Sequence, residues 1–324
     1  DAWSAGGNLI LGTFSAASAG TSKDSALRFG GRFAPNNGFC TNTEEWNGTN
    51  WSEVNDLNDN RHDGMAGGSS ESALFTGGRD GSGIASPALT EYWNGTNWTE
   101  KADLITPRKN GAGAGTTADI IVVGGEAPSA TTHVELYNLS GNAWSETTEA
   151  PTAVSSVDAT GTQNSTFIAS DAPGSSLEWN GSAWSTAAGS IVDRASFGLS
   201  GTVNDAVQVG ASSNTPTKRT CTEKWNGYSW SVGVAMTIGQ SAYRLFQGTG
   251  RSAVQFGSSG GEGTGCVQTQ MYEASDDFID INTLTAQTLF GDGSELTNTT
   301  PDNIVSSSAQ LADQISGSFN KGFE

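Results

Sequence analysis

Short runs of apolar residues recur along residues 1–275, each bounded by glycine and small polar residues. Some of these runs are continuous rather than alternating, as in Ile120-Ile-Val-Val and Thr166-Phe-Ile-Ala. A continuous apolar run of this length is typical of a strand that is buried on both faces. We predict the second strands of the repeats at 26–29, 73–76, 120–123, 166–169, 206–209 and 253–256, and we expect the continuous apolar ones among them to be buried on both faces.

A second pattern places an aromatic residue on each side of a tight turn, as in Trp46-Asn-Gly-Thr-Asn-Trp51 and Trp93-Asn-Gly-Thr-Asn-Trp98. An Asn-Gly pair adopts the positive φ of a two-stranded hairpin, so the two aromatics are expected to face each other. The first aromatic of each copy is Trp46, Trp93, Tyr137, Trp179, Trp225 or Tyr272. The second is Trp3, Trp51, Trp98, Trp144, Trp184 or Trp230, at steps of 48, 47, 46, 40 and 46.

The two sets of aromatics are offset, because Trp3 has no upstream partner and Tyr272 has no downstream tryptophan. A repeat of about 40 to 50 residues with several short strands is typical of propeller blades. An array that begins in the middle of a repeat closes into a ring if its first strand joins the last repeat. We therefore predict an all-β fold, a six-bladed β-propeller over residues 1–275 that is closed by the N-terminal strand.

Glycine and alanine dominate the stretch that precedes each apolar run, as in Gly64-Met-Ala-Gly-Gly and Gly111-Ala-Gly-Ala-Gly. Small residues suit the crowded centre of a ring, so these stretches are the predicted first strands. Several apolar runs end in a glycine pair, at 30–31, 77–78 and 124–125. We expect the missing side chains to let neighbouring blades approach closely.

An arginine follows the second tryptophan by ten residues at Arg61, Arg108 and Arg194. Together with the glycine pair and the two aromatics, this pattern resembles the kelch family of β-propellers, although the fourth repeat is short and lacks the glycine pair. A glutamate also precedes the first aromatic by two, at Glu44, Glu91, Glu135 and Glu223, with Gln270 in the last copy. We interpret the arginines as ties between blades, and the carboxylates as outer-strand hydrogen-bond acceptors or solvent-facing groups.

The blade pattern stops near residue 275, and the segment 276–324 has a different character. It combines short extended pieces around Asp292-Gly293 with a short helical pattern after Pro301 that is closed by Gly317. The stretches 290–298 and 305–319 resemble connector segments in tail-fibre and other virion structural proteins of marine bacteriophages, especially those that infect cyanobacteria. This resemblance implies a virion component, with residues 278–324 forming a stalk or attachment segment of a homo-oligomer, commonly a trimer.

The chain carries 34 acidic and 15 basic residues, a formal net charge of −19, and no basic cluster. Such a surface repels phosphate backbones and anionic lipids, so nucleic acid and membranes are excluded as expected partners. The three cysteines Cys40, Cys221 and Cys266 occupy similar places in different repeats and are expected to be free thiols. The chain begins at Asp1, inside a predicted blade, which leaves open processing or a longer parent protein.

Candidate catalytic and metal-binding groups are few. The two histidines, His62 and His133, fall in different repeats, whereas zinc and copper sites bring several His or Cys ligands together. The histidine, tyrosine and cysteine set of a copper-radical oxidase, the Asp boxes of sialidases and a calcium loop are not found in the sequence. We therefore expect no enzymatic activity, no metal and no cofactor.

The connections between second and third strands vary most in length and composition, at 32–39, 79–87, 126–131, 171–175, 211–218 and 258–265. All of them emerge on one face of a propeller, and loops on a rigid scaffold commonly carry binding residues. The candidate binding residues there are Asn36, Asn37, Arg79, Asp80, Glu126, Asp171, Asn214, Lys218 and Glu262.

Three functions are compatible with these patterns. The first is a non-catalytic fibre-type protein at the exposed surface of a virion, in a tail or capsid fibre, beside other virion proteins, whose propeller recognises a host glycan or protein. The second is a purely structural or decorating virion protein. The third is an extracellular carbohydrate-active enzyme on a kelch ring.

Overall fold

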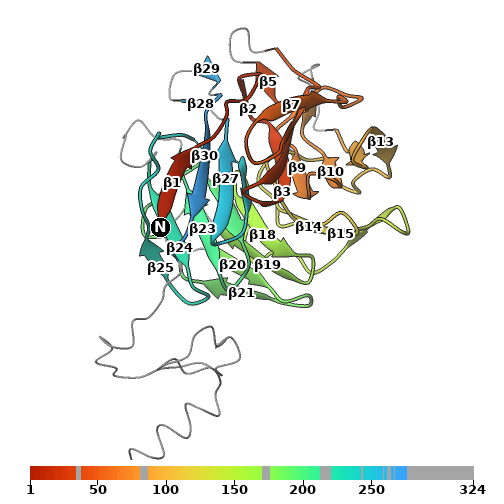
Figure 1. Cartoon of the computed structure of the whole chain (residues 1–324). Helices are drawn as coiled ribbons and strands as arrows, with labels where there is room; N and C mark the ends of the chain where they lie inside the picture. The colour runs from red at the N-terminus through yellow and green to blue at the C-terminus, as the bar shows by residue number, and fades with distance from the viewer. Residues whose placement is uncertain are drawn as a thin grey trace, which may run out of the picture. The chain divides into compact units, whose positions relative to one another are not determined.

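The computed structural model describes residues 1–33, 38–80, 87–169, 176–211, 220–241, 244–257, 259–260, 264–265 and 267–275. Residues Asp1–Ser275 form one compact unit, a six-bladed β-propeller in which each blade is a four-stranded antiparallel sheet (Figure 1). The predicted fold class and number of blades are thereby confirmed. The expected stalk at 278–324 lies outside the described residues.

Blades are numbered by the order in which their first strands occur. Blade 1 contains β3 (Ala17–Ser22), β4 (Ser25–Phe29), β6 (Thr43–Trp46) and β7 (Trp51–Val54). Blade 2 contains β9 (Met65–Gly68), β10 (Ala73–Thr76), β12 (Thr90–Trp93) and β13 (Trp98–Lys101). Blade 3 contains β14 (Ala112–Thr116), β15 (Asp119–Val123), β16 (Val134–Asn138) and β17 (Ala143–Glu146).

The other three blades follow the same plan. Blade 4 contains β18 (Asp158–Thr162), β19 (Ser165–Ala169), β20 (Ser176–Trp179) and β21 (Trp184–Ala187). Blade 5 contains β22 (Gly198–Gly201), β23 (Ala206–Val209), β24 (Thr222–Trp225) and β25 (Trp230–Val232). Blade 6 contains β26 (Phe246–Gly248), β27 (Ser252–Phe256), β30 (Thr269–Glu273) and, from the other end of the chain, β1 (Ala2–Ala5).

The ring is closed by the N-terminal strand, as predicted. β1 pairs antiparallel with β30, and Figure 1 shows the red first strand beside the blue last one. Each inner strand contacts the inner strands of both neighbouring blades, and β26 of blade 6 contacts β3 of blade 1. The six inner strands therefore surround a common axis.

The core consists of the second strands and the paired aromatics. Residues 26–29, 73–76, 120–123, 166–169, 206–209 and 253–256 are all buried. The burial predicted for the continuous apolar runs is confirmed, and the alternating runs also bury their polar residues Arg28, Gln208 and Gln255. Aromatic side chains join neighbouring blades, since Phe29 contacts Trp98 at 4.8 Å and Trp51 contacts Phe256 at 4.7 Å between ring centroids. Burial of each such side chain stabilises the folded protein by roughly 1.5–3 kcal/mol.

The glycine pairs lie where successive blades meet. A Cβ atom on Gly77 would lie 2.3 Å from the carbonyl oxygen of Arg108, and one on Gly124 would lie 2.3 Å from that of Val154. Both glycines have φ near +63°, a conformation that L-residues rarely adopt. The close approach predicted for these glycines is confirmed.

Short ribbons extend some blades beyond the four strands. β2 (Thr13–Phe14) pairs with β5 (Arg32–Phe33), and β8 (Arg61–His62) pairs with β11 (Arg79–Asp80). A further ribbon joins β28 (Ser259–Gly260) to β29 (Thr264–Gly265). Within the described ranges, no helix has the length and apolar character needed to span a membrane.

Candidate functional site

Three consecutive ribbons occupy the face of the propeller from which the connections between second and third strands emerge. In each, a residue of the linker that enters the blade pairs with the residue that follows the glycine pair. These pairs are Phe14 with Arg32 in blade 1, His62 with Arg79 in blade 2 and Lys109 with Glu126 in blade 3. We call this surface the ribbon face. The same backbone position therefore presents different chemistry in each blade.

The ribbon of blade 1 is aromatic and basic. Arg32 forms a backbone bridge with Phe39, and its guanidinium carbon lies 5.6 Å from the ring centroid of Phe14 and 5.3 Å from that of Phe39. All three side chains are half-buried. The negative faces of the two aromatic rings attract the positive guanidinium of Arg32 and restrict its position.

The ribbon of blade 2 continues this surface. The imidazole of His62 lies 5.1 Å from the ring of Phe39 and is only 3% exposed, whereas Arg79 opposite it is exposed. Nδ1 of His62 lies 2.9 Å from a carboxylate oxygen of Asp63. Burial raises the pKa of Asp63, but the hydrogen bond and charge of His62 and the charge of Arg244 outweigh it, so the net shift is downward.

In the ribbon of blade 3 the two opposed side chains, Lys109 and Glu126, form an ion pair. Lys109 donates to the carboxylate of Glu126, and Nδ2 of Asn110 donates to the other oxygen at 3.2 Å. Burial raises the pKa of Glu126, whereas its bonds to Lys109 and Asn110 and the charges of Lys109 and Arg79 lower it further, so the net shift is downward. Glu126 is thus a stable anion that is already neutralised by its neighbours.

One residue per blade adopts a left-handed backbone conformation two positions before the inner strand. These residues are Ser15, Asp63, Asn110, Ser156, Ser196 and Arg244, with φ between 54° and 58°. Backbone hydrogen bonds link some of them around the axis, since Asp63 donates to Ser15, Asn110 to Asp63, and Ser156 to Asn110. They form a ring at the mouth of the channel.

Arg244 closes this mouth. Its Nε donates to the carbonyl of Val157 in the linker to blade 4, and its Nη1 donates to that of Gly64 in the linker to blade 2, both at 3.2 Å. Arg244 itself enters blade 6, so its guanidinium lies across the axis. The other five positions of this ring carry serine, aspartate or asparagine, so Arg244 alone has a side chain long enough to bridge two other blades across the axis.

Beyond Arg244 the inner strands enclose a cavity of about 290 Å³. Asp158 lines this cavity, as Arg244 does, and accepts hydrogen bonds from the backbone N–H groups of Leu199, at 2.8 Å, and Ala159, at 2.9 Å. Burial raises the pKa of Asp158 to about 7, although the N–H groups and the charge of Arg244 lower it. The lining extends to the exposed Thr21 and Thr116 at the turns of the opposite face.

The repeated arginines and glutamates form buried ion pairs with each other. Arg61 contacts Glu91 at 2.8 Å, and the pairs Arg108–Glu135 and Arg194–Glu223 have the same arrangement. Each glutamate also accepts from backbone N–H groups of the linker that enters its blade, as Glu91 does from Asn58 at 2.8 Å. Burial lowers the pKa of the Arg61 and Arg108 guanidinium groups, partly offset by their carboxylate partners. The glutamates are not solvent-facing, and the arginine side chains fasten the linker within one blade rather than tying two blades together.

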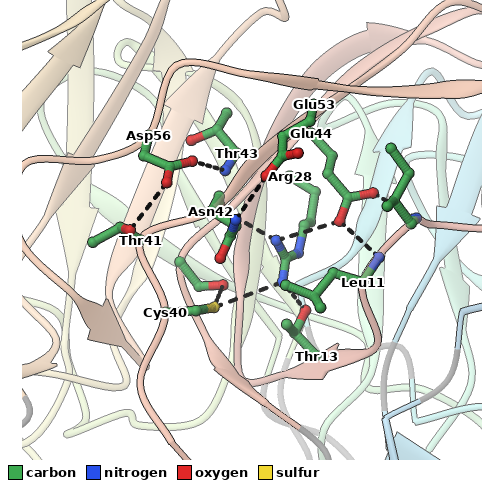
Figure 2. A network of polar contacts seen from close by, with 12 residues as sticks. Leu11, Thr13, Arg28, Cys40, Thr41, Asn42, Thr43, Glu44, Glu53 and Asp56 are labelled. Carbon is green, nitrogen blue, oxygen red and sulfur yellow. Dashed lines mark hydrogen bonds and ion pairs between the residues drawn. The ribbon is translucent and has the colours of Figure 1, made fainter.

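In blade 1 the position of the arginine is taken by Thr13, and Arg28 of the second strand supplies the guanidinium instead (Figure 2). Arg28 lies 3.7 Å from Glu44 and donates to Thr13 and to the carbonyl of Asn42. Burial raises the pKa of Glu44, against the opposing effects of Arg28 and two backbone N–H groups. Blade 1 thus also places a guanidinium beside its glutamate, but the arginine comes from β4 and not from the linker.

Two blades dispense with charge at this place altogether. Blade 6 has an amide pair, in which Nε2 of Gln270 donates to Oε1 of Gln240 at 3.0 Å. Blade 4 has Val154 and Leu177 at the two positions, and both belong to one apolar cluster. In these two blades both positions change together, and blade 1 keeps a guanidinium beside Glu44 through Arg28, which indicates that the network serves the architecture.

The structure describes three of the nine predicted binding residues. Arg79, Asp80 and Glu126 lie on the ribbon face, and the charge of Arg79 acts on Glu126 of the next blade. The other predicted residues, Asn36, Asn37, Asp171, Asn214, Lys218 and Glu262, lie outside the described residues. Sequence reasoning missed Phe14, Arg32 and Lys109. The signal for Arg32 is its place after a glycine pair, which it shares with Arg79 and Glu126.

Candidate chemical groups elsewhere are sparse. Within the described part of the chain, no three His, Cys, Asp or Glu side chains come together as metal ligands. Cys40 and Cys221 are free thiols, as predicted, and burial raises the pKa of both. The third, Cys266, lies outside the described residues.

No protein-family model and no curated protein matches the chain. The propeller fold is therefore established by the coordinates and the internal repeats alone. The resemblances to kelch proteins and to bacteriophage fibre segments remain expectations from the sequence.

Proposed function

We propose that the chain is a fibre-type protein of a bacteriophage virion, in which a kelch-like propeller is displayed for non-catalytic adhesion to a host-surface glycan or protein. The observation that carries the adhesion proposal is the ribbon face. Three equivalent backbone positions on a rigid ring hold the dissimilar pairs Phe14–Arg32, His62–Arg79 and Lys109–Glu126. A scaffold that keeps its backbone and varies its side chains on one face is typical of a recognition surface.

The assignment to a virion is supported by the sequence of residues 290–298 and 305–319, which resembles fibre connectors. In this proposal residues 278–324 join three copies, and the propellers sit at the exposed end of the fibre beside other virion proteins. Weak binding by one propeller is then strengthened when several copies engage one cell surface. The net charge of −19 is unsuited to nucleic acid or to an anionic membrane as the partner.

Binding of the labelled full chain to a panel of marine bacterial cells, cyanobacteria included, tests this proposal. The informative variant is Arg79→Ser/Asp80→Ser on the ribbon face, and its matched control is Lys23→Ser/Asp24→Ser. Each double variant replaces one basic residue and the acidic residue next to it in the sequence. The control pair lies in the turn between β3 and β4 at the opposite face. We expect the first variant to lose binding and the second to retain it.

Two outcomes would contradict the proposal. A chain that binds no cell of a panel containing its host would favour the structural or decorating role. Hydrolysis or oxidation of a surface glycan by the purified chain would favour the carbohydrate-active enzyme.

A further inference from the structure

The outer rim of the propeller has two halves that differ in charge. In the consecutive blades 1, 2 and 3, the outermost strand and the residues just after it expose six carboxylates beside the half-buried Lys101. These carboxylates are Glu53 and Asp56, Glu100 and Asp103, and Glu146 and Glu149. The matching stretches of blades 4, 5 and 6, residues 185–189, 231–235 and 4–8, contain no charged residue. We call these three stretches the neutral half of the rim.

Blade 5 is the middle blade of the neutral half, and it exposes the largest apolar side chains there. Val232 and Val234 are 69% and 46% exposed, and Tyr228 in the turn before β25 is 87% exposed. The same three positions of blade 1 hold Thr49, Glu53 and Asn55. The flanking stretches of blades 4 and 6 hold only serine, threonine, alanine, glycine and asparagine. An apolar centre with a more polar margin, with tyrosine present, is the usual composition of a protein–protein interface.

The backbone of β25 is also open to a partner. β25 lies at the end of its sheet, and among the described strands it pairs with β24 alone. Proteins commonly protect such an edge with charged residues or proline, as Glu53 and Glu100 do on the outermost strands of blades 1 and 2. The stretch 231–235 has neither, so its edge is suited to contact with another chain.

Charged residues near the ends of β1 and β25 are paired within the chain. A carboxylate oxygen of Asp1 lies 3.2 Å from Nζ of Lys224, and one of Glu273 lies 3.2 Å from Nζ of Lys23. Glu178 on the third strand of blade 4 is half-buried. These groups leave the exposed outermost strands of the neutral half without a charge of their own.

The two ends of the propeller lie in the neutral half. β1 is the outermost strand of blade 6, and the backbone N–H of Ser275 donates to the carboxylate of Asp1 at 3.2 Å. The chain therefore continues to residues 276–324 from this half of the rim. Copies of a chain with a net charge of −19 repel each other, so they approach closely only through surfaces that carry no charge.

We propose that a second copy of this chain packs against the neutral half of the rim, with blade 5 nearest the axis that relates the copies. Symmetry brings equivalent surfaces together, and an uncharged patch with an apolar centre can meet its own equivalent without like-charge repulsion. This inference rests on the proposed oligomeric fibre-type protein and specifies where its propellers touch.

The informative variant is Val232→Glu. Blades 1, 2 and 3 carry a glutamate at the same position, so the substitution is compatible with the fold. Sedimentation equilibrium of the full chain measures the dissociation constant of the oligomer, which we expect to rise at least about ten-fold, because the variant places like charges in the contact. Ser52→Glu adds the same charge to the outermost strand of blade 1 and should leave the constant unchanged.

Cross-linking provides a second measurement that does not depend on dissociation. Val232→Cys treated with a short bis-maleimide should yield covalent dimers of the full chain. The unmodified sequence gives the background from its own cysteines, of which Cys40 is buried and Cys221 is half-buried. Ser52→Cys places an exposed thiol in the acidic half and should yield no more dimer than this background.

Three results would overturn the inference: a monomeric full chain, equal cross-linking of Val232→Cys and Ser52→Cys, or equal dissociation constants for Val232→Glu and Ser52→Glu. Cell binding by a monomeric chain would reject this contact and leave the adhesion function intact. An oligomer that cross-links through Val232→Cys but binds no cell would keep the contact and reject adhesion.

Discussion

Trp3 lies opposite Tyr272 in the antiparallel pair of β1 and β30, with their ring centroids 5.2 Å apart. The other blades hold the same aromatic pair within one hairpin, but this pair comes from the two ends of the propeller. The indole Nε1 of Trp3 also donates to the carbonyl of Val234 in the linker that enters blade 6, at 3.0 Å. The contact therefore closes the ring.

Replacement of Trp3 by alanine should lower the free energy of unfolding by about 3–5 kcal/mol, because a large buried ring is lost and because no hairpin turn joins its strand to β30. Urea denaturation followed by circular dichroism measures the change. The control is Trp184→Ala, since Trp184 is half-exposed and its strand is joined to its neighbour by a turn. An equal loss in both variants would contradict the closing role of Trp3.

The buried ion pair of blade 5 is suited to a double-mutant cycle. Arg194→Gln or Glu223→Gln alone leaves one uncompensated buried charge and should cost about 3–5 kcal/mol. The double variant reproduces the amide pair of Gln240 and Gln270 and should cost clearly less than the sum of the two single changes. Strictly additive effects would show that the two side chains are not energetically coupled.

Gly77 should tolerate no side chain. It has φ +64°, and an added Cβ would lie 2.3 Å from the carbonyl oxygen of Arg108. We expect Gly77→Ala to cost more than about 2 kcal/mol through backbone strain and separation of the blades. Gly141→Ala is the control, since its Cβ would meet nothing closer than 3.4 Å, and its unfolding free energy should stay within about 0.5 kcal/mol of the parent.

Asp158 should make the stability of the propeller depend on pH. Its pKa is raised from 3.8 to about 7 in the folded state, so between these values the native protein holds a proton that the unfolded chain has released. The contribution to stability from this group is therefore full below pH 4 and is lost as the pH rises to about 7. The slope is roughly 1.4 kcal/mol per pH unit within this window.

Unfolding free energies measured from pH 4 to 8 test this dependence. Asp158→Asn should flatten the curve, whatever its effect on absolute stability, whereas Asp119→Asn removes an equal charge from an exposed site and should retain the slope. An unchanged slope in Asp158→Asn would assign the pH dependence to other groups.

The repeats predicted the architecture because aromatic pairs and apolar runs are local in sequence. The offset of Trp3 and Tyr272 was enough to predict the closing strand. The pairing of Arg61 with Glu91 was not predicted, because the two positions lie thirty residues apart and meet only when the linker folds over its blade. Their joint replacement by Val154 and Leu177 in blade 4 was the available signal.

The candidate site was predicted only in part. Arg79, Asp80 and Glu126 follow a glycine pair, which marks the end of a buried strand and the start of an exposed connection. Arg244 gave no comparable signal, since serine, aspartate or asparagine fills its position in the other blades. Its role depends on reaching the backbone of blades 2 and 4 across the ring, which no local pattern encodes.

The guanidinium of Arg244 lies across the axis of the propeller at the ribbon face, between the carbonyls of Val157 and Gly64. On the opposite side the cavity extends to the exposed turns at Thr21 and Thr116, which gives solvent a route to the Asp158 carboxyl group from that face. A bulky receptor seated on the ribbons would leave that route open, so occupancy on one side of the disc need not alter acid titration on the other.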